Sequence, residues 1–407
     1  MVDSIGLFGL VVSILAVSIL FRLSVVNGKV DYFSPPFVFF FLVFAGCVIR
    51  AIIFISNPPQ YLLYGSIALL IAVLFYSIGY IIPAHKYVSP FMLQKTLFFV
   101  KSKFIYYITI AFALVLTVFF FRETGFSIGA RFLLTEDGVR TSHAALQWGA
   151  DILYVAFLLR LSIKRNFKSV GLLYIVFFII SLYASALLGA RLSMLLYILA
   201  ALLVRFYCGD RKIYFTPFII IAIFIIGVIG AARTSHQGGE SYGVLNTFVE
   251  HSMQRPYMLS LDKLSFIVGS MSDNGQYWYG KSFASILLIP IPRNIFENKP
   301  DLGARKYVGQ EIYQLNNLAG VPPGFIGELF INFSWFGIVI GMFAMGYVCR
   351  ILWNTFKKYK TDPLLTVWYS IFYIFLITIL GVDALGAVVL YFKLYIPALL
   401  LGRYYNP

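Results

Sequence analysis

Residues 322–352 read PPGFIGELFINFSWFGIVIGMFAMGYVCRIL. Two prolines and a glycine end whatever element precedes them, and the apolar run 324–352 is long enough to cross about 30 Å of hydrocarbon as one helix. Glu328 is the only charged residue of this run before Arg350. We therefore expect a membrane-spanning helix over 324–352 that starts beside a loop and carries one carboxylate near its beginning.

The composition of the whole chain indicates the same environment. Hydrophobic residues make up 60% of the chain and charged residues 12%, whereas about 25% of the residues in soluble domains are charged. The three cysteines lack paired spacing, which favours neither a disulfide framework nor a thiolate metal site. No basic residue precedes the first apolar run, so we expect that run to remain in the mature protein. The chain is predicted to be an all-α polytopic membrane protein.

Apolar runs of membrane-spanning length recur along the sequence, and we expect about eleven transmembrane helices. They cover 4–21, 37–55, 61–82, 104–121, 145–163, 170–189, 192–207, 214–231, 324–352, 364–382 and 384–402. Along the chain, short loops rich in lysine and arginine alternate with short loops that are nearly free of these residues. By the positive-inside rule the N-terminus is outside and the C-terminus is cytoplasmic.

This topology predicts three parts of the chain. Residues 1–231 hold transmembrane helices one to eight, residues 232–323 form a large, partly helical outside loop, and residues 324–407 hold helices nine to eleven. Much of the net charge of +15 follows from the charge alternation of the loops, so the basic balance does not require nucleic acid as a partner.

Two outside loops are basic, against the rule, which suggests an anionic ligand. Each cation there could instead be a solvated surface residue. Arg191, in the short turn between helices six and seven, is a candidate ligand because an ionisable group at the membrane is costly to bury unpaired. Its alternative role is to extend towards lipid headgroups. Arg50, near the outer end of the second predicted helix, has the same two roles, with the lipid-headgroup role favoured more strongly. Lys393, mid-way along the last helix, could pair inside the bundle or extend towards the cytoplasmic side, and the sequence does not decide between these.

The start of the predicted helix at 324 has features of a binding site. The free N–H groups of Gly324 to Gly327 and the helix dipole favour a phosphate group. Glu328 and Asn332, four residues apart, would share one helix face and look into one cavity. Alternatively, Glu328 only complements the helix dipole.

The aromatic run Tyr277, Trp278 and Tyr279 offers ring faces suited to sugars, although aromatic residues are equally common at membrane interfaces. The sequence contains no Asp-x-Asp, His-Glu-x-x-His, Walker or dinucleotide motif, and its histidines lack ligand spacing. We therefore expect neither a metal nor a cofactor.

Several of these segments together resemble a known family. They are Gly280-Lys281-Ser282, Ile291-Pro292-Arg293, Lys299-Pro300 with Gly303, and Pro323-Gly324-x-x-Gly327-Glu328. This set resembles the Wzy-type oligosaccharide repeat-unit polymerases of bacteria, the O-antigen polymerases of lipopolysaccharide biosynthesis. The turn Gly189-Ala190-Arg191-Leu192-Ser193 resembles the arginine turn of the wider O-antigen ligase and polymerase superfamily.

The resemblance implies a membrane glycosyltransferase of the GT-C type, in the bacterial inner membrane, with its large loop and N-terminus in the periplasm. Its substrates would be undecaprenyl-diphosphate-linked oligosaccharides, and a chain-length regulator and a flippase of the same pathway are candidate partners. Arg191, Arg293 and Arg305 would bind the diphosphate, and Glu328 would act as general base or orient the acceptor hydroxyl. The glycan would be contacted by Lys299, the aromatic run and Asn332.

Two other functions stay open at this point. A ligase of the same superfamily would move the finished glycan from its lipid diphosphate to another acceptor. A transporter or flippase for lipid-linked sugars would favour charged or broken helices near the middle of the membrane and two related halves.

Overall fold

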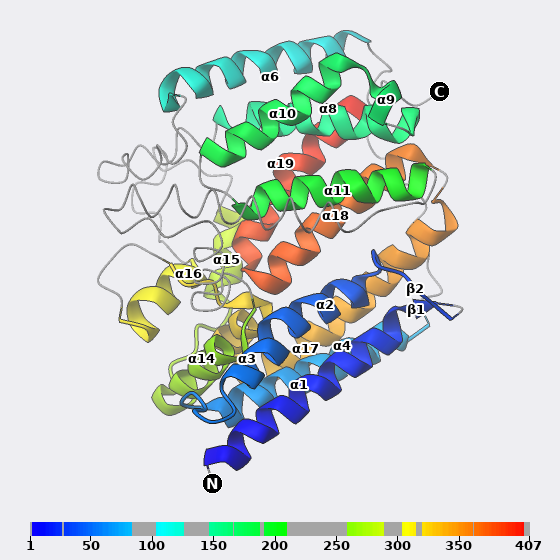
Figure 1. Cartoon of the computed structure of the whole chain (residues 1–407). Helices are drawn as coiled ribbons and strands as arrows, with labels where there is room; N and C mark the ends of the chain where they lie inside the picture. The colour runs from blue at the N-terminus through cyan, green and yellow to red at the C-terminus, as the bar shows by residue number, and fades with distance from the viewer. Residues whose placement is uncertain are drawn as a thin grey trace. The chain divides into compact units, whose positions relative to one another are not determined.

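The computed structural model of the chain (Figure 1) describes residues 2–26, 28–83, 103–125, 146–165, 167–187, 191–209, 259–288, 303–314, 320–360 and 362–402. In these ranges the secondary structure is helical apart from one short hairpin, in which Val25–Val26 (β1) pairs antiparallel with Lys29–Val30 (β2). Within these ranges, seven helices are long and apolar enough to cross a membrane. The predicted all-α, membrane-embedded character is therefore confirmed for the described part of the chain.

Several predicted spans agree closely with helices. The runs 61–82, 104–121, 364–382 and 384–402 correspond to α4 (Leu62–Ile81), α6 (Lys103–Thr124), α18 (Pro363–Gly381) and α19 (Ala384–Gly402). The runs at 170 and 192 form shorter helices, α10 (Leu172–Leu187) and α11 (Arg191–Cys208), and that at 145 forms α8 (Trp148–Lys164). The run 214–231 lies outside the described residues, and the total of eleven spans stays a prediction.

Contacts divide the chain into two compact units. The first unit comprises 1–88, 256–355 and 375–390, and the second comprises 89–255, 356–374 and 391–407. This division crosses the predicted topological parts, because each unit takes helices from both ends of the sequence. The three-part membrane topology stays a prediction.

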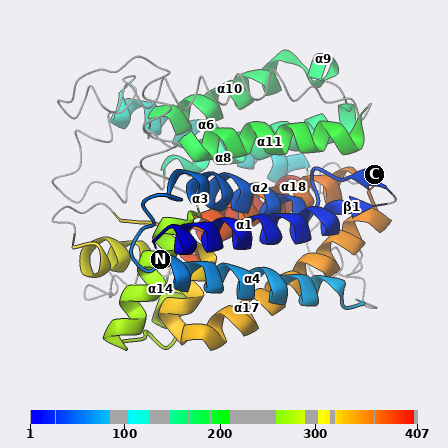
Figure 2. The same ribbon diagram turned by 60° about the horizontal axis from the view of Figure 1, so that its bottom comes forward.

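The first unit is built around α1 (Val2–Ser24), α4 and α17 (Gly324–Lys358). Figure 2 shows α1 and α4 running side by side. Glycines let α4 and α17 touch backbone to backbone: a Cβ on Gly79 would overlap the carbonyl of Phe343, and one on Gly346 would overlap that of Tyr76. Small residues at helix contacts are typical of membrane proteins, where close packing replaces the hydrophobic driving force.

The remaining elements of the first unit cover these helices. A second span consists of α2 (Pro35–Val43), a π-helical turn (Phe44–Val48) and α3 (Ile49–Ile53). From the expected outside loop come α14 (Leu261–Asn274), α15 (Lys281–Leu288), α16 (Ala304–Tyr307) and a π-turn (Val308–Ile312). Helix α14 packs against α4, where Gly65 meets the backbone of Ser265.

The helix expected over 324–352 is interrupted, which corrects the prediction of one uninterrupted span. Phe333 and Ser334 have non-helical dihedrals, and Ser334 lies at φ 57° and ψ −149°. The residues from Trp335 to Lys358 span about 36 Å at 1.5 Å per residue, enough to cross the hydrocarbon alone. The preceding turns, Gly324 to Asn332, are therefore a separate short helix, and Glu328 lies in it.

The second unit centres on α8, which is buried from Gly149 to Leu159. Helices α6, α10 and α11 pack around it, with α9 (Phe167–Val170) between α8 and α10. The rings of Tyr154 and Tyr197 stack at 4.1 Å, and the Tyr154 hydroxyl donates to the carbonyl of Tyr197 at 2.8 Å.

A buried charge pair also lies in the second unit. Asp151 of α8 accepts a 2.5 Å hydrogen bond from the Tyr197 hydroxyl, and its other oxygen lies 4.0 Å from the ammonium of Lys393 in α19. The Trp148 indole donates to the Lys393 carbonyl at 3.0 Å. Lys393, for which the sequence favoured no role, therefore pairs with a carboxylate inside the helix bundle.

Candidate functional site

The start of α17 is fixed by hydrogen bonds to neighbouring segments of the first unit. Gly324 has φ 69°, which glycine adopts without strain. Its N–H donates to the carbonyl of Val382 at 2.8 Å, so one donor of the predicted phosphate cradle is already used. The carbonyl of Pro322, just before the helix, accepts a hydrogen bond from the Lys263 ammonium at 3.1 Å.

The end of this short helix is fixed by the aromatic run. The break at Phe333 leaves carbonyls of the preceding turn without helical partners. The N–H groups of Trp278 and Tyr279 satisfy two of them, bonding the carbonyls of Ile331 and Asn332 at 2.9 Å each. The backbone of the aromatic run therefore caps the helix that carries Glu328.

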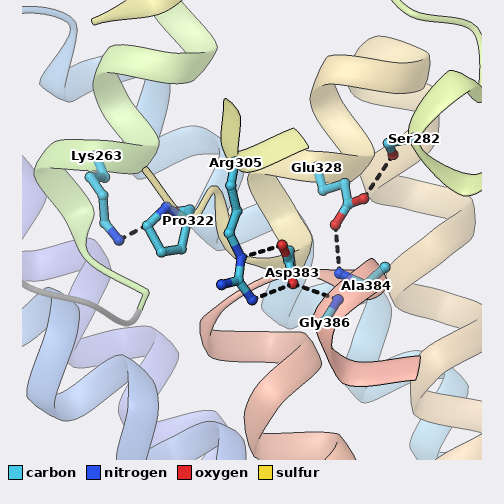
Figure 3. A network of polar contacts seen from close by, with 8 residues as sticks. All are labelled: Lys263, Ser282, Arg305, Pro322, Glu328, Asp383, Ala384 and Gly386. Carbon is cyan, nitrogen blue, oxygen red and sulfur yellow. Dashed lines mark hydrogen bonds and ion pairs between the residues drawn. The ribbon is translucent and has the colours of Figure 1, made fainter. Parts of the chain in front are cut away.

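Glu328 is fully buried, and both of its carboxylate oxygens accept hydrogen bonds (Figure 3). Oε1 accepts from the Ser282 hydroxyl at 2.7 Å, and Oε2 accepts from the backbone N–H of Ala384 at 2.7 Å. Ala384 is the first residue of α19, so this carboxylate lies at a helix N-terminus, where a negative charge is stabilised.

Asn332 joins the same cluster. Its amide donates to the Ser282 hydroxyl at 2.8 Å and to the Glu328 carbonyl at 2.7 Å, while its oxygen accepts from the Ser282 N–H at 3.3 Å. Glu328 and Asn332 thus share one face, as predicted. They face Ser282 rather than the predicted open cavity, because all three side chains are buried.

A second carboxylate follows directly beside this cluster. Asp383, the residue before Ala384, forms an ion pair with Arg305 through the Arg305 Nε, and Nη2 donates to Oδ1 at 2.8 Å. The N–H of Gly386 also donates to Oδ1, at 2.9 Å. A Cβ on Gly386 would overlap both Arg305 and Asp383, so glycine is required there for this pair.

Together these contacts define what we call the 328–383 cluster: Ser282, Arg305, Glu328, Asn332, Asp383 and the Ala384 N–H. The side chain of Arg305 is 41% exposed and that of Asp383 is 4% exposed, so the guanidinium can face a ligand while the buried carboxylate orients it. Asp383 offsets part of its positive charge, which weakens Arg305 as a phosphate ligand on its own.

The side chains of the aromatic run diverge. Trp278 packs on Tyr307 at 4.4 Å and Tyr277 on Phe330 at 5.9 Å between ring centroids. Tyr279 is 78% exposed and is the ring of the three best placed to meet a glycan or a lipid headgroup. Gly327 is not required by packing, since a Cβ there would meet Ile267 and Pro323 at ordinary distances from 3.4 Å.

For the remaining predicted ligands the structure gives no position relative to this cluster. Arg293 and Lys299 lie outside the described residues. Arg191 is the first residue of α11 in the second unit, and the structure does not describe its side chain. Their predicted roles stay predictions.

Sequence reasoning missed Asp383, gave no role to Ser282, and counted Lys263 only among the basic residues of the outside loop that suggest an anionic ligand. Asp383 stands alone between two apolar runs, 364–382 and 384–402, and an isolated carboxylate at such a boundary is the signal that could have identified it. Ser282 has no signal of its own, because its partners lie about 50 residues further along the chain.

Comparison of the chain with family models, curated proteins and solved structures finds no match. The function is therefore argued from the site and from the residues that carry the resemblance.

Proposed function

We propose that this protein polymerises undecaprenyl-diphosphate-linked oligosaccharide repeat units into a surface polysaccharide such as O-antigen. The proposed reaction is inverting glycosyl transfer at the periplasmic face of the bacterial inner membrane, by a protein of GT-C type. The observation that carries the proposal is the 328–383 cluster, a buried carboxylate beside an arginine at one end of a membrane-length helix.

The proposed reaction requires a base for the acceptor and positive charge for the leaving group, and the cluster offers both. The acceptor sugar's hydroxyl oxygen forms a bond to the anomeric carbon of the donor chain. The bond from that carbon to the lipid diphosphate breaks, and the diphosphate leaves with the electron pair. The acceptor proton passes to a base, and Glu328 is the candidate. Arg305, with Arg191 and Arg293, would stabilise the negative charge on the leaving group.

Direct proton transfer requires Glu328 to come within about 3 Å of the acceptor hydroxyl. Because Ser282 occupies Oε1, the base becomes accessible when α15 moves or the Ser282 side chain rotates. Helix α15 also stacks Phe283 on Phe333, at the break of α17, with the rings 4° from parallel. A displacement of α15 would therefore uncover Glu328 and Asn332 together.

The proposal is tested in the source bacterium by deleting the gene and complementing it. We expect the deletion to abolish the ladder of long surface polysaccharide while single repeat units still reach the final acceptor. Complementation with Arg305→Ala should leave the ladder short or absent, whereas Lys29→Met, a change of an exposed lysine on β2, should restore it. Long chains that accumulate on the lipid carrier would instead identify a ligase.

One observation favours a second candidate, a flippase for lipid-linked sugars. The buried pair of Asp151 and Lys393 lies among apolar helices, and charged groups in such places often mark transport pathways. The break in α17 does not add to this case, because a full membrane-spanning length of helix follows it. Accumulation of repeat units on the cytoplasmic leaflet in the deletion strain would support the flippase.

A further inference from the structure

A second group of cations lies in the first unit, apart from the contacts that hold Glu328. Lys263 of α14 is only 7% exposed. Its ammonium has three donors, and within the described ranges it makes one hydrogen bond, to the Pro322 carbonyl at 3.1 Å. Figure 3 shows Lys263 and Arg305 on either side of the segment that leads into α17. Lys263 is thus a buried cation with unused donors beside a helix start.

Arg50 of α3 is the second buried cation of this group, at 5% exposure. Its Nε lies 3.8 Å from Oδ1 of Asp262, which is beyond hydrogen-bond distance, and its guanidinium lies 5.8 Å from the Phe54 ring. Among the described residues, Nη2 of Arg50, Oδ1 of Asp262 and Oγ of Ser260 are all buried without a hydrogen-bond partner. Buried polar groups are normally satisfied. Nη2 of Arg50 and the Ser260 hydroxyl can donate and are expected to contact a ligand or water, whereas Oδ1 of Asp262 can only accept and needs a donor such as water.

The charges of the group do not balance. Asp262 is the acidic neighbour that favours the charged form of Lys263, while both Arg50 and Arg305 disfavour it. Asp383 offsets Arg305, and Asp262 offsets one of the other two cations. Among the residues that the structure describes, one buried positive charge of this group remains uncompensated. Burial, opposed by Asp262 and reinforced by Arg50 and Arg305, lowers the pKa of Lys263 to about 8.

We propose that Arg50 and Lys263, together with Arg305, form a phosphate-binding site at the start of α17. An anion there would neutralise the excess charge and accept hydrogen bonds from the free donors of Lys263 and Arg50. A phosphate suits the site because its several oxygens can accept from cations on different elements at the same time. The short helix begins two residues after Pro322, whose carbonyl Lys263 contacts, and free N–H groups at a helix start favour a phosphate in the same way.

In the proposed reaction, this site would bind the second of two lipid diphosphates. A polymerase of this type binds two lipid diphosphates at once, one on the donor chain and one on the acceptor unit. Arg305 belongs to both groups of residues and links them. The identity of the bound phosphate as a lipid diphosphate rests on the proposed function, whereas the phosphate site itself rests on the contacts and charges above.

The test measures binding, without glycosyl transfer, to the purified full-length protein in detergent. The probes are inorganic pyrophosphate and undecaprenyl diphosphate, titrated against wild type, Lys263→Met and Arg50→Lys. Lys29→Met is the matched control, since it removes one exposed lysine from the same unit. We expect the Kd of at least one probe to rise about tenfold or more in both cluster variants, as for loss of one charge-assisted hydrogen bond, and to stay unchanged in the control.

The two probes distinguish the sources of the phosphate. Binding of the lipid alone, or of both probes, supports a lipid diphosphate, and binding of pyrophosphate alone supports a site for free phosphate. If Lys263→Met does not fold, Lys263→Arg takes its place, because it keeps the charge but moves the donors. Equal affinity in wild type and folded cluster variants, or no binding by wild type, would overturn the site. A wild-type protein that binds the lipid but does not polymerise would overturn only the proposed function.

Discussion

Glu328 is the residue on which catalytic and structural explanations of the site differ most. Its carboxylate is buried but well supplied with donors, the Ser282 hydroxyl and the Ala384 N–H. A carboxylate that only joins three segments of the fold needs these donors. A base needs them too, in order to stay ionised until the acceptor arrives. Substitution by an isosteric neutral side chain separates the two.

We expect Glu328→Gln to keep the fold and to lose most of the activity. The glutamine oxygen can accept from Ala384, and its amide can donate to the Ser282 hydroxyl, so the contacts survive with one hydrogen bond reversed. Loss of a general base should lower the polymerisation rate by about 10²- to 10⁴-fold. The rate is measured on purified variants of equal thermal stability, and a rate near that of wild type would make Glu328 a structural residue.

Lys263 makes the stability of the protein depend on pH. Its folded-state pKa of about 8 lies below the ordinary lysine pKa of 10.5, so between these values the unfolded chain binds more protons than the folded one. The free energy of unfolding should therefore rise with pH across this window. The cost of the buried charge, about 3 kcal/mol at most, is fully present below pH 8 and relieved towards pH 10.5.

The measurement compares thermal midpoints of wild type and Lys263→Met in detergent from pH 7 to pH 10. Lys263→Met should be the more stable protein at pH 7, and the difference should shrink above pH 8. The charged or titratable neighbours of Lys263 are Asp262, Arg50, Arg305 and Cys47, and Asp262 in turn lies near Tyr313; all remain in the variant. A constant difference over the whole range would show that Lys263 does not change its charge there.

At the scale of elements, the break in α17 decides where Glu328 lies. A continuous helix from Gly324 to Lys358 would be about 52 Å long, well beyond the hydrocarbon thickness. The break sets the first turns apart, and the hydrogen bonds from Trp278 and Tyr279 hold them in place. The site is thus supported by segments from the loop and not by the spanning helix alone.

Substitutions at Ser334 test the break. Its φ of 57° is unfavourable for a residue with a side chain. Ser334→Gly should therefore keep or raise stability, by up to about 1 kcal/mol, and Ser334→Val should lower it. In an uninterrupted helix the order would be reversed, because glycine costs about 1 kcal/mol there. Thermal midpoints of the two variants give the sign.

The helices also show how much of the fold could be predicted from the sequence. Length and hydropathy predicted α4, α6, α18 and α19 almost to the residue, because an apolar helix in lipid satisfies its own hydrogen bonds and needs no partner to be defined. They did not predict the break at Phe333, where neither proline nor glycine interrupts the run. The partners that stabilise it, at 278 and 279, lie more than 50 residues away in the sequence.

The candidate site, too, was predicted only in part. The sequence singled out Glu328 and Asn332 by their position after a predicted helix start and Arg305 as a cation of the outside loop, and all three lie in the 328–383 cluster. Asp383 is 78 residues from its partner Arg305, and Lys263 is 59 residues from Pro322. Pairings over such distances follow from tertiary packing, which hydropathy and spacing do not encode.

At the scale of the whole molecule, the prediction concerns orientation in the membrane. The loop charges predict that 232–323 faces the periplasm and the cluster at 357–360 the cytoplasm. Tyr279 is 78% exposed and Lys358 is exposed at the other end of α17. An impermeant thiol reagent added to intact spheroplasts should therefore label Tyr279→Cys but not Lys358→Cys, each in a background without Cys47, Cys208 and Cys349. The opposite labelling would place the site on the wrong side for the proposed reaction.

The polymerase proposal itself is tested most directly with purified protein and chemically defined substrate. The wild-type chain, in lipid nanodiscs with a metal chelator present, is given undecaprenyl-diphosphate-linked repeat units from its own source, and the products are separated by length. We expect a ladder of products that grows by one repeat unit per step, with release of undecaprenyl diphosphate and no requirement for a metal. A folded wild-type protein that leaves every repeat unit single, both with and without added divalent metal, would contradict the proposed function.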